Sequence, residues 1–152
     1  MKNIIPFFAL LTIAFTSCKK DKNDRKPLDE ALISTTWITT AEKHVYYNEA
    51  ILPLLEENKP EGVRYVFDEE TETVSIRDVE GNSTQKQYSL FQINGKDFVN
   101  IISAQGTETF QITAYTNQTM SWRQEKTNQT YGDGKVAAKA LVTVDFHCPC
   151  PR

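Results

Sequence analysis

The chain has 152 residues, of which 39% are hydrophobic and 24% charged, so it suits one globular domain and is too apolar to be disordered throughout. Its net charge is −3, whereas nucleic-acid-binding proteins need positive charge to neutralise phosphates, so this class of protein is not favoured. Two histidines and three cysteines restrict metal or thiol chemistry to a few positions.

The N-terminus has the pattern of an export signal. Residues 4–15 are hydrophobic apart from one proline and one threonine. This run is too short for a membrane-spanning helix, which needs about 20 residues, and has the length of the apolar region of a signal peptide. The sequence FTSC at 15–18 resembles the lipobox of bacterial lipoproteins. That resemblance implies a signal peptide over 1–17 and a diacylglycerol on Cys18. An ordinary signal peptide with an incidental cysteine is the alternative.

A charged tether is predicted to follow the anchor, over residues 18–27. Residues 19–26 read KKDKNDRK, with five basic and two acidic side chains and no apolar one, so they have nothing to bury. From residue 27 onward the net charge is −7, which keeps the folded part away from an anionic membrane surface. The domain itself is predicted to span 28–152.

Within this domain, the sequence LDEALI at 28–33 favours a short helix with Leu28 and Leu32 on one face. The remainder is rich in Thr, Val, Ile, Phe and Tyr, and turn residues recur about every ten positions, which predicts strands. The eight expected strands are 36–46, 63–68, 72–79, 84–92, 97–104, 108–116, 119–127 and 136–148. Asn94-Gly95 is the strongest hairpin signal, because both residues tolerate positive φ.

Hydrophobic residues alternate with polar ones along these strands. One such face carries Phe110, Ile112 and Ala114, and another carries Met120 and Trp122, which Gln124 and Lys126 continue towards the strand end. A sheet with one apolar and one polar face is typical of antiparallel pairing. Eight consecutive strands with short connections therefore predict an all-β fold, an antiparallel up-and-down barrel. A two-sheet β-sandwich is the alternative.

The tether, the short helix, the sequence STTW at 34–37 and seven further strands resemble the lipocalin-like (calycin-type) β-barrels of small bacterial lipoproteins. The resemblance implies a cup lined by inward side chains, with the connection 47–62 over its mouth. We expect that connection to hold a short helix interrupted at Pro53. Its apolar residues would either form a lid over a ligand or fill the core. The candidate ligand-binding residues are Tyr65, Phe67, Tyr88, Phe110, Ile112, Trp122, Gln124, Leu52 and Leu55.

The C-terminal sequence HCPC contains the other two cysteines, Cys148 and Cys150. If Cys18 is acylated, these two remain as a pair in an oxidising compartment, either as a redox-active pair or as a passively oxidised tail. A metal site is not predicted, because the Cys-x-Cys gap is shorter than usual and there is no second cysteine pair.

These features predict a lipid-anchored binding module of the cell envelope, expected at the outer membrane, that holds a small, partly apolar ligand. The alternative is a structural or interaction lipoprotein with a filled barrel. No enzyme activity is predicted, because neither a nucleophile–His–acid arrangement nor a phosphate-binding glycine loop is recognisable. We expect no cofactor and no nucleic-acid partner, and the sequence identifies no protein partner.

Overall fold

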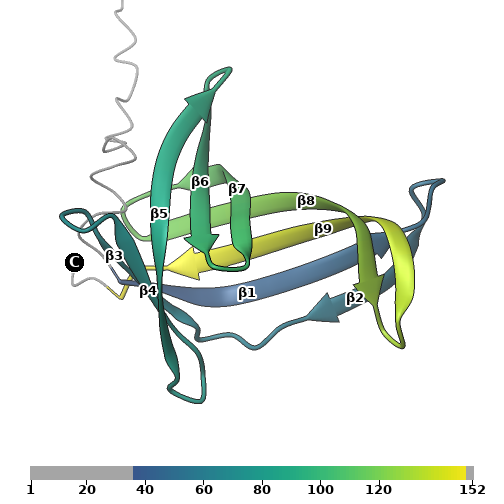
Figure 1. Ribbon diagram of the computed structural model, residues 1–152, viewed down its shortest axis with the longest axis horizontal. Helices are drawn as coiled ribbons and strands as arrows, with labels where there is room; N and C mark the ends of the chain where they lie inside the picture. The colour runs from purple at the N-terminus through teal and green to yellow at the C-terminus, as the bar shows by residue number, and fades with distance from the viewer. Residues whose placement is uncertain (1–35, 150–152) are drawn as a thin grey trace, which may run out of the picture.

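The computed structural model describes residues 36–149. The predicted signal peptide, Cys18, the tether, the short helix at 28–33 and Cys150 lie outside the described residues. Within 36–149 the chain forms nine β-strands, shown in Figure 1. They are β1 (Thr36–Tyr47), β2 (Pro53–Asn58), β3 (Arg64–Asp68), β4 (Thr73–Arg77), β5 (Ser83–Ile93), β6 (Lys96–Ser103), β7 (Gly106–Tyr115), β8 (Thr119–Tyr131) and β9 (Lys135–His147).

These strands form one continuous antiparallel sheet that closes on itself. Each strand from β3 to β9 pairs with the next, and β9 pairs with β1 to complete an eight-stranded barrel. One edge of β1 is shared, since its first residues pair with β3 and its last with the extra strand β2. The predicted all-β, eight-stranded barrel is therefore confirmed. A two-sheet sandwich is excluded because the strand order has no break.

The β5–β6 hairpin turns at Asn94-Gly95, as the sequence predicts. Both residues have positive φ, 51° and 72°, which is the backbone shape that a two-residue hairpin loop requires. An alanine at Gly95 would meet no neighbouring atom, so the glycine is needed there for its backbone conformation rather than for space.

The connection between the first two predicted strands differs from expectation. The predicted helix interrupted at Pro53 is wrong, because the chain makes a turn and then returns as β2 alongside β1. Asn48 holds the turn by accepting a hydrogen bond from Leu52 N at Oδ1, at 2.9 Å. Ile51 and Leu52 are 70% and 60% exposed, so they cover no core. Pro53 begins an outermost strand, where a missing N–H is tolerated.

The core is an aromatic cluster centred on Trp122. The rings of Tyr65, Phe67, Phe110 and Phe146 lie with their centroids 4.7 to 6.3 Å from that of Trp122. These distances are typical of favourable aromatic pairs, each of which contributes about 0.5–1.5 kcal/mol beyond its burial. The Trp122 face predicted from alternation is confirmed.

One predicted inward residue faces outward. The pairing of β7 with β8 shifts between Ile112 and Ala114, so a β-bulge reverses the alternation there. Ala114 is exposed as a result, and Tyr115 packs against the core in its place.

The strands differ greatly in length. Strands β1, β8 and β9 have 12, 13 and 13 residues, whereas β3 and β4 have five each. Figure 1 shows the long strands running well beyond the barrel, with β2 widening this extension.

We expect Met120→Ala to destabilise the protein by about 2–5 kcal/mol, because Met120 is 1% exposed and its loss leaves a cavity in the core. Val136→Ala, at a position 62% exposed, should change stability by less than about 0.5 kcal/mol. Urea unfolding of both variants measures the difference. Equal effects would contradict the assignment of the core.

Candidate functional site

The inner face of the barrel changes from apolar to polar at one level. Along β8, the buried side chains of Met120 and Trp122 are followed on the same face by Gln124 and Lys126. Along β7, Phe110 is followed in the same direction by Glu108. Because alternate residues of a strand share a face, these polar groups continue the line of the aromatic core.

The sheet register brings polar groups of β1 and β2 to the same level. Residues directly opposite each other on paired strands point to one face, so the rows can be read across the sheet. Three rows run outwards from the core: Trp122–Val144–Glu42, then Gln124–Val142–His44–Glu57, then Lys126–Ala140–Tyr46–Leu55. We call the inward-facing set Glu42, His44, Tyr46, Glu57, Lys59, Glu108, Gln124 and Lys126 the polar end.

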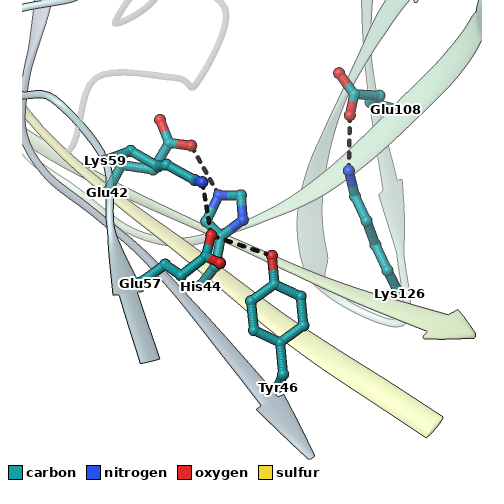
Figure 2. Close-up of polar contacts among 7 residues, drawn as sticks. All are labelled: Glu42, His44, Tyr46, Glu57, Lys59, Glu108 and Lys126. Carbon is teal, nitrogen blue, oxygen red and sulfur yellow. Dashed lines mark hydrogen bonds and ion pairs between the residues drawn. The ribbon is translucent and has the colours of Figure 1, made fainter. Parts of the chain in front are cut away.

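On β1 and β2 the polar end forms a linked network, drawn in Figure 2. His44 Nε2 lies 2.8 Å from Glu42 Oε1. Lys59 Nζ lies 2.7 Å from Glu57 Oε2, which also accepts a hydrogen bond from the Tyr46 hydroxyl at 3.5 Å. These side chains are partly buried, so their contacts are less screened by water than surface pairs are.

The Glu57–Lys59 contact affects both charges. The hydrogen bond from Lys59 is the main cause that lowers the pKa of Glu57. Desolvation opposes this effect, and the positive charge of Lys59 adds to it. The same hydrogen bond raises the pKa of Lys59. Both groups are therefore held in their charged forms at neutral pH.

A second ion pair spans the gap between β7 and β8. Lys126 Nζ lies 2.8 Å from Glu108 Oε1. The pairing of β7 with β8 ends at Gln111–Arg123. Glu108 and Lys126 therefore lie beyond the last paired residues, where the two strands have separated. Figure 2 draws this pair together with the network on β1 and β2.

Tyr65 lies between the aromatic core and the polar end. Burial is the main cause that raises the pKa of its phenol, and the carboxylates of Glu42 and Glu108 add to the shift. Tyr65 is therefore a neutral phenol at physiological pH. Within residues 36–149 its hydroxyl makes no hydrogen bond, which leaves a donor beside two carboxylates.

Three buried polar atoms on the inner face lack partners within the described part of the chain. They are Trp37 Nε1, Trp122 Nε1 and Gln124 Oε1. Leaving such an atom unpaired costs about 1–3 kcal/mol, and an ordered water or a bound ligand would remove that cost. Trp122 and Gln124 are two residues apart on one face of β8, which places a donor and an acceptor next to the polar end.

The predicted ligand-binding residues fall into four groups. Phe67, Tyr88, Ile112 and Trp122 are buried in the core. Tyr65 and Phe110 are partly buried against it, and Gln124 belongs to the polar end. Leu52 is 60% exposed at the β1–β2 turn, whereas Leu55 is 36% exposed and lies on the inner face opposite Tyr46.

Sequence reasoning missed the acidic and basic groups of β1 and β2. Alternation from Trp37 predicts odd-numbered inward residues, but the register with β9 shifts between Thr39 and Ala41, so Glu42 and His44 face inwards. Glu57 was missed because β2 was not predicted. Glu108 was within reach, since it lies on the same face as Phe110.

Cys148 is buried and disulfide-bonded. Both other cysteines, Cys18 and Cys150, lie outside the described residues, so the predicted redox pair stays a prediction. Among residues 36–149, no group of three or more His, Cys, Asp or Glu side chains is placed to hold a metal ion.

Comparison with protein-family models and with curated proteins finds no match for this sequence. Nor does any helix within residues 36–149 have the length and hydrophobicity needed to cross a membrane.

We expect Glu57 to make the stability of the protein depend on acidic pH. Its pKa is lowered in the folded state, so its stabilising effect is complete above the unfolded value of 4.5 and is lost as the pH falls through the folded value. Glu57→Gln should therefore lose less stability on acidification than the wild type does. Lys59→Met, which removes the partner, should behave in the same way. Urea midpoints between about pH 6 and pH 3 measure this, and an unchanged slope in both variants would refute the coupling.

Proposed function

We propose that the protein is a lipid-anchored binding module of the bacterial cell envelope, with a lipocalin-like barrel tethered through Cys18. In this proposal the polar end holds a small ligand that has both hydrogen-bonding and apolar parts. The observation that carries the proposal is the set of unpaired polar atoms on the inner face, above all Gln124 Oε1 and Trp122 Nε1.

The composition of the inner face supports a ligand of mixed character. Small-molecule sites combine apolar walls with a few well-placed polar groups. Here the aromatic cluster around Trp122 lies on one side of the polar end. A second apolar cluster lies on the other, where Tyr46 stacks on Tyr131 at 5.2 Å and packs with Ala137 and Ala140. A ligand at the polar end would contact apolar groups on both sides.

The ligand is proposed at the polar end rather than among the aromatic residues. Phe67 and Tyr88 pack edge to face at 4.9 Å, and Trp122 is enclosed by four rings, so these side chains already contact one another. They would form the floor beneath the ligand. Tyr65 and Gln124 would supply its first hydrogen bonds.

Envelope location is supported by the N-terminal sequence and by the disulfide. The lipobox-like FTSC supports Cys18 as the acylated cysteine of this proposal. Disulfides persist in oxidising compartments such as the periplasm and the cell surface, which agrees with the disulfide at Cys148. Acylation of Cys18 would leave Cys150 as the only partner for Cys148 within the chain.

A structural or interaction role is the second candidate. It is favoured by the exposed Ile51 and Leu52 beside β2, which pairs only with β1 among the described strands. Exposed apolar residues next to an open strand edge suit contact with another protein. In that role, Ile51→Asn should abolish partner binding and leave the polar end intact.

We expect Cys18→Ala to release the protein from the membrane, because the diacylglycerol has no other attachment site. Cell fractionation and mass spectrometry of the wild-type N-terminus measure this. Cys150→Ala is the matched control and should stay membrane-bound. A wild-type chain that keeps residues 1–17 or carries no lipid would refute the anchor.

We expect Gln124→Leu to lose ligand binding and yet to keep or gain stability. The leucine removes a buried oxygen that has no partner. Without a ligand, this oxygen lowers the stability of the protein by about 1–3 kcal/mol, and with a ligand it accepts a hydrogen bond from it. The measurement is native mass spectrometry of the protein after incubation with an extract of envelope lipids and metabolites, with a urea melt alongside. Gln118→Leu, at an exposed turn, is the control. If no molecule is retained by the wild type, or if Gln124→Leu retains it equally, the proposed site is wrong.

A further inference from the structure

The outer surface of the barrel has a cavity where β7 and β8 part. Its volume is about 340 Å³, within the range of about 300–1,000 Å³ that is usual for small-molecule sites. The outward-facing residues that line it are Lys96, Phe98, Thr109, Gln111, Arg123 and Glu125. Gln124, whose side chain faces inwards, borders it as well. We call this the lateral cavity.

One wall of the lateral cavity is aromatic. Phe98 stacks on Phe91 of the neighbouring strand, with centroids 5.3 Å apart and ring planes 12° from parallel. The two rings are on the outer face, because their neighbours Val99 and Leu90 pack into the core. The stack therefore holds a flat apolar surface in a fixed orientation beside polar groups.

The charged groups of the opposite wall are held in place. Glu125 contacts Arg123 Nη2 through Oε1 and Lys139 Nζ through Oε2, each at 2.7 Å. The Lys139 hydrogen bond is the main cause that lowers the pKa of Glu125, so this carboxylate is charged and neutralised by two cations. Its charge does not repel an anion as a free carboxylate would.

Other groups of the cavity are available to a ligand. Within residues 36–149, the side chains of Lys96 and Gln111 make no hydrogen bond or ion pair. Thr109 donates its hydroxyl hydrogen to Asn100 Oδ1 at 2.7 Å, so its oxygen can still accept one. The cavity thus offers the free ammonium of Lys96 and the free amide of Gln111 beside the Phe98 ring.

We propose that the lateral cavity binds an acidic saccharide. The apolar face of a sugar ring would lie on Phe98, and its hydroxyls, each both donor and acceptor, match the side-chain amide of Gln111 and the hydroxyl oxygen of Thr109. Lys96 is the unpaired cation that would contact a uronate carboxylate. This site is on the outer surface and is independent of the ligand proposed for the polar end.

The test is calorimetric titration of the full chain in detergent micelles with hexagalacturonate, and with cellohexaose as the neutral probe. The wild type should bind hexagalacturonate more tightly than cellohexaose. Gln111→Ala should weaken the binding of both about five- to tenfold, because one hydrogen bond is lost. Lys96→Gln should lower the affinity for hexagalacturonate to the cellohexaose level and leave cellohexaose unchanged.

Two controls keep the proposal falsifiable. Lys135→Gln removes an exposed charge from the distant β8–β9 turn, and Gln118→Ala removes an exposed amide outside the cavity. Both should bind like the wild type. The proposal is overturned if the wild type binds neither hexagalacturonate nor cellohexaose. It is also overturned if Gln111→Ala and Lys96→Gln bind both probes as tightly as the wild type does. An equal loss of hexagalacturonate affinity in Lys135→Gln and Lys96→Gln would overturn it too, because that result would reflect general charge attraction.

Discussion

The pairing of β1 with β9 is the constraint on which the rest of the structure depends. It runs from Ile38–His147 to Tyr47–Lys139 and closes the sheet, so the barrel has no free edge along this seam. The bulge after Thr39 sets which side chains of β1 face inwards. Thr39 fixes the bulge, because its carbonyl accepts a hydrogen bond from Gly62 N at 2.8 Å and its hydroxyl accepts one from Val63 N at 3.0 Å. Without this shift, Lys43 and Val45 would replace Glu42 and His44 on the inner face.

The polar end is not explained by stability. Partly exposed ion pairs such as Lys126–Glu108 contribute about 0–1 kcal/mol, whereas continuing the aromatic core with apolar residues would bury more surface. Unpaired atoms beside them add a cost. A region that carries charges and unpaired donors where the fold needs neither is the kind of place where binding is expected.

The sequence predicted the barrel well because its strands alternate and its turns carry strong local signals. Asn94-Gly95 and the Met120–Trp122 face depend only on neighbouring residues, and the structure confirms both. Strand β2 was missed because PLLEEN does not alternate and contains a proline, and its existence depends on pairing with β1. The bulges at Thr39 and Ile112 were missed for the same reason, since a change of register is defined by the partner strand. These errors determined which site residues were predicted. Gln124 was predicted because it lies on an alternating strand. His44 was missed because of the bulge in β1, and Glu57 was missed because β2 was not predicted.

A single departure of one strand creates both the polar end and the lateral cavity. Strand β8 stays paired with β9 along its whole length, from Thr119–His147 to Tyr131–Lys135, but leaves β7 after Arg123. On the inner side the gap is bridged by Lys126 and Glu108, and on the outer side it is bordered by Gln111 and Arg123. Gln124 is the first residue past the separation, which explains why it lines the cavity while its buried carbonyl oxygen has no partner. In a fully paired barrel, β7 would follow β8 here and neither feature would exist, so the two sites share a geometric cause although they face opposite sides of the sheet.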